Sequence, residues 1–145
     1  MKRRALRARL VLTAVSFVSA AEAEPAPAAA LTAQLVCQRA AAPGRILCEL
    51  TTRARSGKLV WSDALVVSAP VFARPLRSRS VAELDASGAP RASSKLALVA
   101  LSTGEGTLEV LARAVVCREG TNGEWCSPEV LPLTAPIVVG PVAPR

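Results

Sequence analysis

The chain has 145 residues, a formal net charge of +7, and neither histidine nor tyrosine. It therefore cannot contain a Ser-His-Asp or Cys-His catalytic centre, an imidazole metal site or a tyrosine nucleophile.

Residues 1–23 have the three parts of a secretory signal peptide. A basic start without acidic residues precedes an apolar run at 10–18, and small residues follow up to Ala23. We expect cleavage after Ala23, with Ala20 or Ala21 as alternatives. The apolar run is far shorter than the roughly 20 residues that span a bilayer, and no cysteine follows it to accept a lipid. The pattern predicts export to the periplasm or the medium, with no transmembrane segment in the mature protein.

Cleavage after residue 23 leaves 122 residues, enough for one domain. Five of the 18 basic and one of the 11 acidic residues leave with the signal, so 13 basic and 10 acidic residues give the mature chain a charge of +3. Its aromatic residues are Trp61, Phe72 and Trp125. Few positive charges and few stacking side chains are unlike a nucleic-acid-binding protein, and we expect no nucleic-acid partner.

Residues 24–30 form a Pro/Ala-rich tether, and we expect a single β domain over 31–140. Three segments in its first half alternate apolar and polar residues, the period of a half-buried strand. Their apolar faces are Leu31, Ala33, Leu35 and Cys37; Ile46, Cys48 and Leu50; and Leu59, Trp61, Leu65 and Val67. We expect Trp61 in the core. Asp63 interrupts the third face, which indicates either a partly buried acid or a β-bulge that turns it outward.

Residues 80–87 fit two structures. Ser80 and Glu83 have the spacing of a capping box and Gly88 could end a short helix, but the same stretch also fits a strand that leads into a turn.

Residues 96–116 predict a hairpin with Gly104-Glu105 as its two-residue loop. Leu101 would then lie opposite Leu108, and Val99 opposite Val110. An inward stripe follows on the second strand: Leu108, Val110, Ala112, Ala114 and Val116. Cys117 would face outward by the same alternation, which requires a bulge or a disulfide on the outer surface.

The C-terminal part of the chain is rich in proline, which cannot donate to a β-ladder, so we expect an edge strand or a loop there. Residues 137–139 are the expected last strand and 141–145 a tail. About seven short strands separated by turns predict an all-β fold, an antiparallel β-sandwich with immunoglobulin-like topology. A small β-barrel is the alternative.

Four cysteines in an exported domain indicate a disulfide framework with three possible connectivities. Cys37 and Cys48 flank a turn-like segment at 41–44, and Cys117 and Cys126 flank another at 120–123. The spacing favours one disulfide across each hairpin, Cys37–Cys48 and Cys117–Cys126. A four-cysteine metal site would usually bring its ligands in C-x-x-C pairs, which the chain lacks, so we expect no metal ion.

Two groups of residues are candidates for binding. Arg74, Arg77 and Arg79 form a basic patch able to hold an anionic glycan or a lipid head group; the alternative is that these charges protect an edge strand. Trp125, beside a cysteine near a hairpin tip, either covers the disulfide or is exposed as an anchor for a partner.

Catalysis would have to depend on carboxylates. Pairing of Cys117 with Cys126 would place Glu119 opposite Glu124, where two carboxylates can act as an acid/base pair or hold a cation. A solvated hairpin tip explains these residues better, so we expect no catalytic residue, no enzyme activity and no cofactor.

The leading functional hypothesis is a non-catalytic binding or structural module of the cell envelope or exterior. Its partner would be an envelope or extracellular protein or an anionic glycan. One alternative is an inhibitor of a secreted hydrolase that inserts the loop 118–125. The other is a carboxylate-dependent hydrolase that uses Asp63, Glu119 and Glu124.

Overall fold

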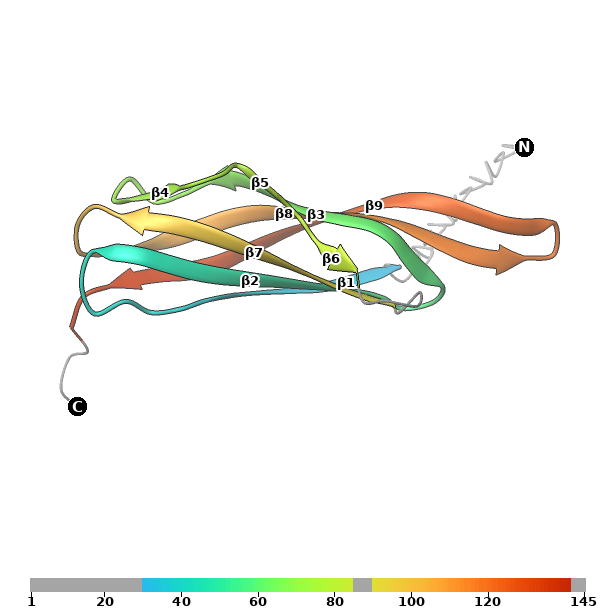
Figure 1. The fold of residues 1–145 in the computed structure, drawn as a ribbon, viewed down its shortest axis with the longest axis horizontal. Helices are drawn as coiled ribbons and strands as arrows, with labels where there is room; N and C mark the ends of the chain where they lie inside the picture. The colour runs from blue at the N-terminus through green and yellow to red at the C-terminus, as the bar shows by residue number, and fades with distance from the viewer. Residues whose placement is uncertain (1–29, 85–89, 142–145) are drawn as a thin grey trace, which may run out of the picture.

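The computed structural model describes residues 30–84 and 90–141, which form two antiparallel β-sheets packed face to face (Figure 1). The expected signal peptide, residues 24–29 of the tether and residues 142–145 of the tail lie outside the described residues. Within those two ranges, no helix is long and apolar enough to cross a membrane.

The first sheet has the strand order β1-β2-β7-β4, with the short strand β6 also beside β7; the second has the order β5-β3-β8-β9. The first sheet consists of β1 (Leu31–Cys37), β2 (Gly44–Ala54), β4 (Ala73–Pro75), β6 (Glu83–Leu84) and β7 (Arg91–Ala100). The second consists of β3 (Lys58–Ser68), β5 (Arg79–Val81), β8 (Gly104–Gly120) and β9 (Gly123–Val139).

The order of the long strands is that of an immunoglobulin-like sandwich. Strands β1, β2 and β7 occupy the A, B and E positions of one sheet, and β3, β8 and β9 occupy the C, F and G positions of the other. The strands form two separate sheets and not a closed barrel, so the sandwich prediction is confirmed and the barrel alternative is wrong.

Alternate residues of the long strands make the core. The predicted inward stripe of β8 is buried along its whole length, and so are Ile46, Cys48 and Leu50 of β2. Between the layers, the hydroxyl oxygens of Thr52 and Ser62 lie 3.0 Å apart in a hydrogen bond that joins the two sheets. Period two therefore identified the buried face of both strands, because a strand with one buried face has little freedom of register.

A β-bulge in β3 changes the face on which its residues lie. The pairing with β8 shifts between Leu59 and Trp61, so Val60 is the extra residue. Leu59 points into the core, whereas Trp61 and Asp63 lie on the outer face opposite Val115 and Arg113. The core position expected for Trp61 is therefore wrong. Both expectations for Asp63 are confirmed, because the bulge turns it to the outer face and its side chain is nevertheless fully buried.

The hairpin predicted over 96–116 does not form. Strand β7 pairs with β2 in the first sheet and β8 pairs with β3 and β9 in the second, so the segment at 101–103 crosses between the sheets. Leu101 is 59% exposed and does not lie opposite Leu108. Gly104 serves a close contact and not a turn, because a Cβ there would lie 2.8 Å from the ring of Phe72.

Residues 73–84 cross between the two sheets and return. β4 pairs with β7, β5 pairs with β3, and β6 pairs with β7 again. The short helix considered for 80–87 is therefore wrong for the part that the structure describes, because both sheets offer an open edge that this segment fills with strands. Residues 85–87 lie outside the described residues.

The proline-rich segment forms most of β9, an edge strand that is much longer than expected. Pro128, Pro132 and Pro136 lie opposite Val115, Leu111 and Thr107 of β8. Residues four apart present their backbone nitrogens to the same side of a strand. Because β9 pairs with β8 along its whole length, these three nitrogens point away from β8, toward the open edge of the sheet. The prolines therefore remove no hydrogen bond between β8 and β9.

Candidate binding site

The β8–β9 hairpin extends beyond the body of the sandwich (Figure 1). Pairing of β3 with β8 ends at the rung of Lys58 and Cys117, whereas β8 and β9 remain paired as far as Gly120 and Gly123. Three rungs, about 10 Å of strand, therefore have no third strand beside them. We call residues 118–125 the finger.

The turn between β2 and β3 supports the base of the finger. Arg118 donates a hydrogen bond from Nε to the hydroxyl oxygen of Ser56 at 3.0 Å. Gly57 has φ +85°, and a Cβ there would lie 2.2 Å from the carbonyl oxygen of Cys117. The turn thus contacts β8 so closely that only glycine fits.

A disulfide closes the same base. Cys117 and Cys126 are directly opposite in register and bonded, as are Cys37 and Cys48 at the other hairpin; these are the two pairings that the spacing predicts. Cys117 faces outward as expected from alternation, yet it is only 3% exposed. The disulfide fixes the register of the finger. A partner that binds the finger would therefore restrict few additional backbone torsions, which lowers the entropic cost of binding.

Trp125 presents the largest apolar surface of the finger and is 50% exposed. It lies opposite Arg118, whose guanidinium carbon is 5.1 Å from the centroid of the indole ring. This cation–π contact orients the ring without covering it. Because neighbouring residues on a strand point to opposite faces, Trp125 lies on the face opposite Cys126 and does not cover the disulfide.

The two acidic residues of the finger lie near one lysine, which forms an ion pair with Glu124. Glu119 and Glu124 are opposite each other, as pairing of the cysteines predicts, and Lys58 Nζ lies 2.6 Å from Glu124 Oε1. The hydrogen bond and charge of Glu124, with a smaller effect of Glu119, raise the pKa of Lys58 above its ordinary 10.5. The ammonium group of Lys58 therefore neutralises part of the negative charge of the finger.

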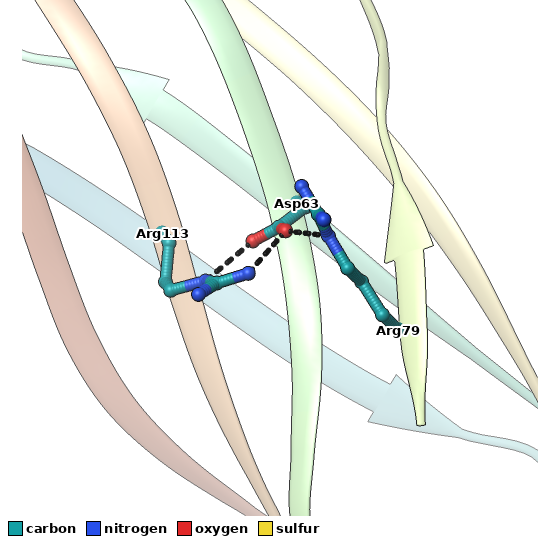
Figure 2. Close-up of polar contacts among 3 residues, drawn as sticks. All are labelled: Asp63, Arg79 and Arg113. Carbon is teal, nitrogen blue, oxygen red and sulfur yellow. Dashed lines mark hydrogen bonds and ion pairs between the residues drawn. The ribbon is translucent and has the colours of Figure 1, made fainter. Parts of the chain in front are cut away.

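The basic patch expected from Arg74, Arg77 and Arg79 is divided between the two sheets. Arg79 lies on the outer face of the second sheet, where its Nε donates to Asp63 Oδ2 at 2.5 Å (Figure 2). Arg113 contacts the same carboxylate from the other side. The Arg79 and Arg113 guanidinium carbons lie 5.5 and 5.8 Å from the ring centroid of Trp61. Arg79 is thus part of an internal ion-pair cluster.

Arg77 instead lies in the connection between β4 and β5, beside the first sheet. It lines a hollow of about 280 Å³ together with Arg45 and Lys95. Arg74 is exposed on β4, opposite Val99 of β7. The chain turns between β4 and β5, so Arg77 and Arg79 do not project together as an uninterrupted strand would require.

No protein-family model matches the chain, and no curated protein or solved structure matches it significantly. Among the described residues, no group of three or more His, Cys, Asp or Glu is placed to hold a metal ion. The candidate site therefore consists of the finger and the charged surface of the sheets.

Sequence reasoning missed three residues of these surfaces: Lys58, Arg45 and Lys95. The alternation gave a signal for Arg45, because it precedes the buried Ile46 and must point outward. Its neighbours could not be known, since they depend on the order β2-β7 and on the path of residues 73–84.

Proposed function

We propose that this chain is an exported, non-catalytic binding module of the cell envelope or exterior, and that the finger is its contact surface for a protein partner. The observation that carries the proposal is the half-exposed Trp125 on a projecting, disulfide-closed hairpin. Tryptophan and arginine are the side chains most often responsible for affinity at protein interfaces, and Trp125 and Arg118 stand here as a pair.

Export is supported by two separate features. Residues 1–23 have the pattern of a signal peptide, and the two disulfides indicate that the domain folds in an oxidising compartment. The finger depends on that compartment, because one of these disulfides closes it.

An inhibitor of a secreted hydrolase is the second candidate. A narrow two-stranded finger with a rigid base has the shape of an element that enters a cleft, and its preorganisation lowers the entropic cost of insertion. This candidate uses the same residues, so the identity of the partner separates it from the first.

A carboxylate-dependent hydrolase has less support. Both oxygens of Asp63 accept hydrogen bonds from guanidinium groups, and the carboxylate is fully buried. Glu124 is paired with Lys58 in an exposed position where nothing excludes water. A proton-transfer role would require these groups to be free to contact a substrate.

The test is photo-crosslinking from the tip of the finger. The full-length gene is expressed in a secreting host with a photoreactive residue at Thr121, and the exported protein is irradiated in an envelope extract. Trp125→Ala removes the proposed anchor. Leu101→Ala is the matched control, because Leu101 is 59% exposed in the β7–β8 connection at the opposite end of β8.

We expect one cross-linked partner that is lost in Trp125→Ala and retained in Leu101→Ala. Retention of the partner in Trp125→Ala would show that the anchor is elsewhere. Absence of any specific product over several salt concentrations would count against the binding proposal as a whole. Inhibition of a lysozyme or protease by the wild type, abolished in Trp125→Ala, would favour the inhibitor candidate.

A further inference from the structure

The outer face of the first sheet is strongly basic. The outward residues of β2, β7 and β4 include five cationic side chains, Arg45, Arg53, Arg74, Arg91 and Lys95. The same sheet carries two outward acids, Glu49 on β2 and Glu83 on β6. We call this surface the basic face.

One end of the basic face is a cationic hollow. Arg45, Arg77 and Lys95 line it together with the hydroxyl group of Ser80, and none of the three makes an ion pair with another described residue. Glu49 and Glu83 line adjacent hollows with Lys95, but neither is within ion-pairing distance of it. Glu49 is the register partner of Lys95 and offsets part of its charge, so Arg45 and Arg77 supply most of the positive charge around this space of about 280 Å³.

The other end places two arginines directly opposite each other. Arg53 of β2 and Arg91 of β7 are register partners and line a second hollow, of about 380 Å³, with Thr32, Gln34 and Thr51. Neither arginine makes an ion pair within residues 30–84 and 90–141. Like charges opposite each other destabilise a sheet, so this pair is costly unless an external anion neutralises it.

The spacing of the two hollows selects a long ligand. Arg45 and Arg53 are eight residues apart on β2, roughly 27 Å along the strand. A single phosphate or carboxylate can occupy one hollow only, whereas a chain with repeated negative charges can occupy both.

We propose that the basic face binds an anionic polysaccharide lying along β2. Thr32, Gln34 and Thr51 offer hydroxyl and amide groups for hydrogen bonds to sugars beside the charges. The aromatic residues lie elsewhere: Trp61 is on the second sheet, Trp125 is on the finger, and the ring of Phe72 packs against Gly104 and the core. A surface without aromatic side chains cannot stack bases, which disfavours single-stranded nucleic acid. This proposal does not depend on the finger.

The test measures binding of the exported protein to dextran sulfate and to polygalacturonate, with neutral dextran as the uncharged probe, at several NaCl concentrations. We expect affinity only for the charged polymers. Arg45→Gln with Arg77→Gln and Lys95→Gln should weaken binding about tenfold or more and flatten its dependence on salt, as should Arg53→Gln with Arg91→Gln.

Arg39→Gln with Arg55→Gln is the matched control for the two-arginine variant, since it also removes two positive charges but from positions outside both hollows. An equal loss in this control would overturn the proposal, because net charge alone would then explain the binding. Binding to vesicles with anionic lipid, but to neither polymer, would also overturn it and would identify a membrane surface. Trp125→Ala should leave polymer binding unchanged, so this proposal and that for the finger fail independently.

The melting temperature gives a second test that needs no ligand. Arg91→Gln should raise the melting temperature in the absence of polymer, because it relieves the repulsion with Arg53. Added dextran sulfate should stabilise the wild type more than this variant. A melting temperature lowered by Arg91→Gln would contradict the repulsion on which this end of the site is based.

Discussion

The buried carboxylate of Asp63 on β3 accepts two hydrogen bonds from the guanidinium group of Arg113 on β8, directly across the ladder (Figure 2). Arg113 Nε lies 2.8 Å from Oδ1 and Nη2 lies 2.6 Å from Oδ2. The hydrogen bond to Asp63 raises the pKa of Arg113 above its ordinary value. Arg79 adds a third hydrogen bond from β5, so one carboxylate joins three strands of the second sheet.

Asp63→Asn should destabilise the domain by about 2–4 kcal/mol, because it leaves a buried amide beside two guanidinium groups that have lost their counter-charge. Urea unfolding followed by tryptophan fluorescence measures this change. Glu49→Gln is the control, since Glu49 is exposed and makes no ion pair with a described residue. Equal stability of Asp63→Asn and Glu49→Gln would mean that the cluster contributes nothing.

How much of this arrangement the sequence could predict differs from strand to strand. The buried faces of β2 and β8 were predictable, because a strict alternation with one apolar face admits a single register. The interrupted pattern around Asp63 allowed a bulge but could not locate it. The shift at Val60 decides that Trp61 and Asp63 share the outer face with Arg113.

The candidate site was predictable only in part. The spacing of the cysteines and the glycines at 120 and 123 gave the hairpin, its turn and its disulfide. That the hairpin projects depends on where β3 begins, which the turn at Ser56 and Gly57 decides. The separation of Arg77 from Arg79 depends on a segment that crosses between two sheet edges, a long-range feature that local periodicity does not record.

Gly57→Ala should destabilise the domain more than Gly123→Ala. Both glycines have positive φ, +85° and +105°, so both substitutions strain the backbone by about 1–2 kcal/mol. Only at Gly57 does the added Cβ also meet backbone, at 2.2 Å from the carbonyl oxygen of Cys117; at Gly123 nothing lies within 4 Å. Thermal unfolding of the two variants compares them directly, and equal melting temperatures would rule out the close contact at the base of the finger.

The ion pair of Lys58 with Glu124 should contribute stability at neutral pH and lose that contribution in alkali. Because the folded-state pKa of Lys58 is raised above 10.5, the contribution is complete below the pKa of the unfolded lysine and disappears as pH rises through the folded value. The stability difference between wild type and Lys58→Met should therefore stay constant from about pH 7 to about pH 9 and shrink above that. In a Glu124→Gln background the same substitution should show no such dependence; a dependence that persists would assign it to another group.

The two disulfides should contribute similar free energies of unfolding but stabilise different parts of the molecule. Their sequence separations of 11 and 9 residues predict a loss of about 2–3 kcal/mol for each pair replaced by serine, in the chain-entropy account. Cys37–Cys48 lies in the core between β1 and β2. Cys117–Cys126 lies at the last rung that β3 supports.

Hydrogen exchange should distinguish the two sites. Replacing both Cys117 and Cys126 with serine should accelerate exchange of the finger amides at 118–125, which have no third strand, and leave those of β2 and β7 protected. Replacing both Cys37 and Cys48 with serine should instead accelerate exchange in β1. Protein purified from the periplasm or medium and digested without reduction should yield one linked peptide for each pair. A peptide joining Cys37 to Cys117 or to Cys126 would contradict the fold, and four free thiols would contradict export as well.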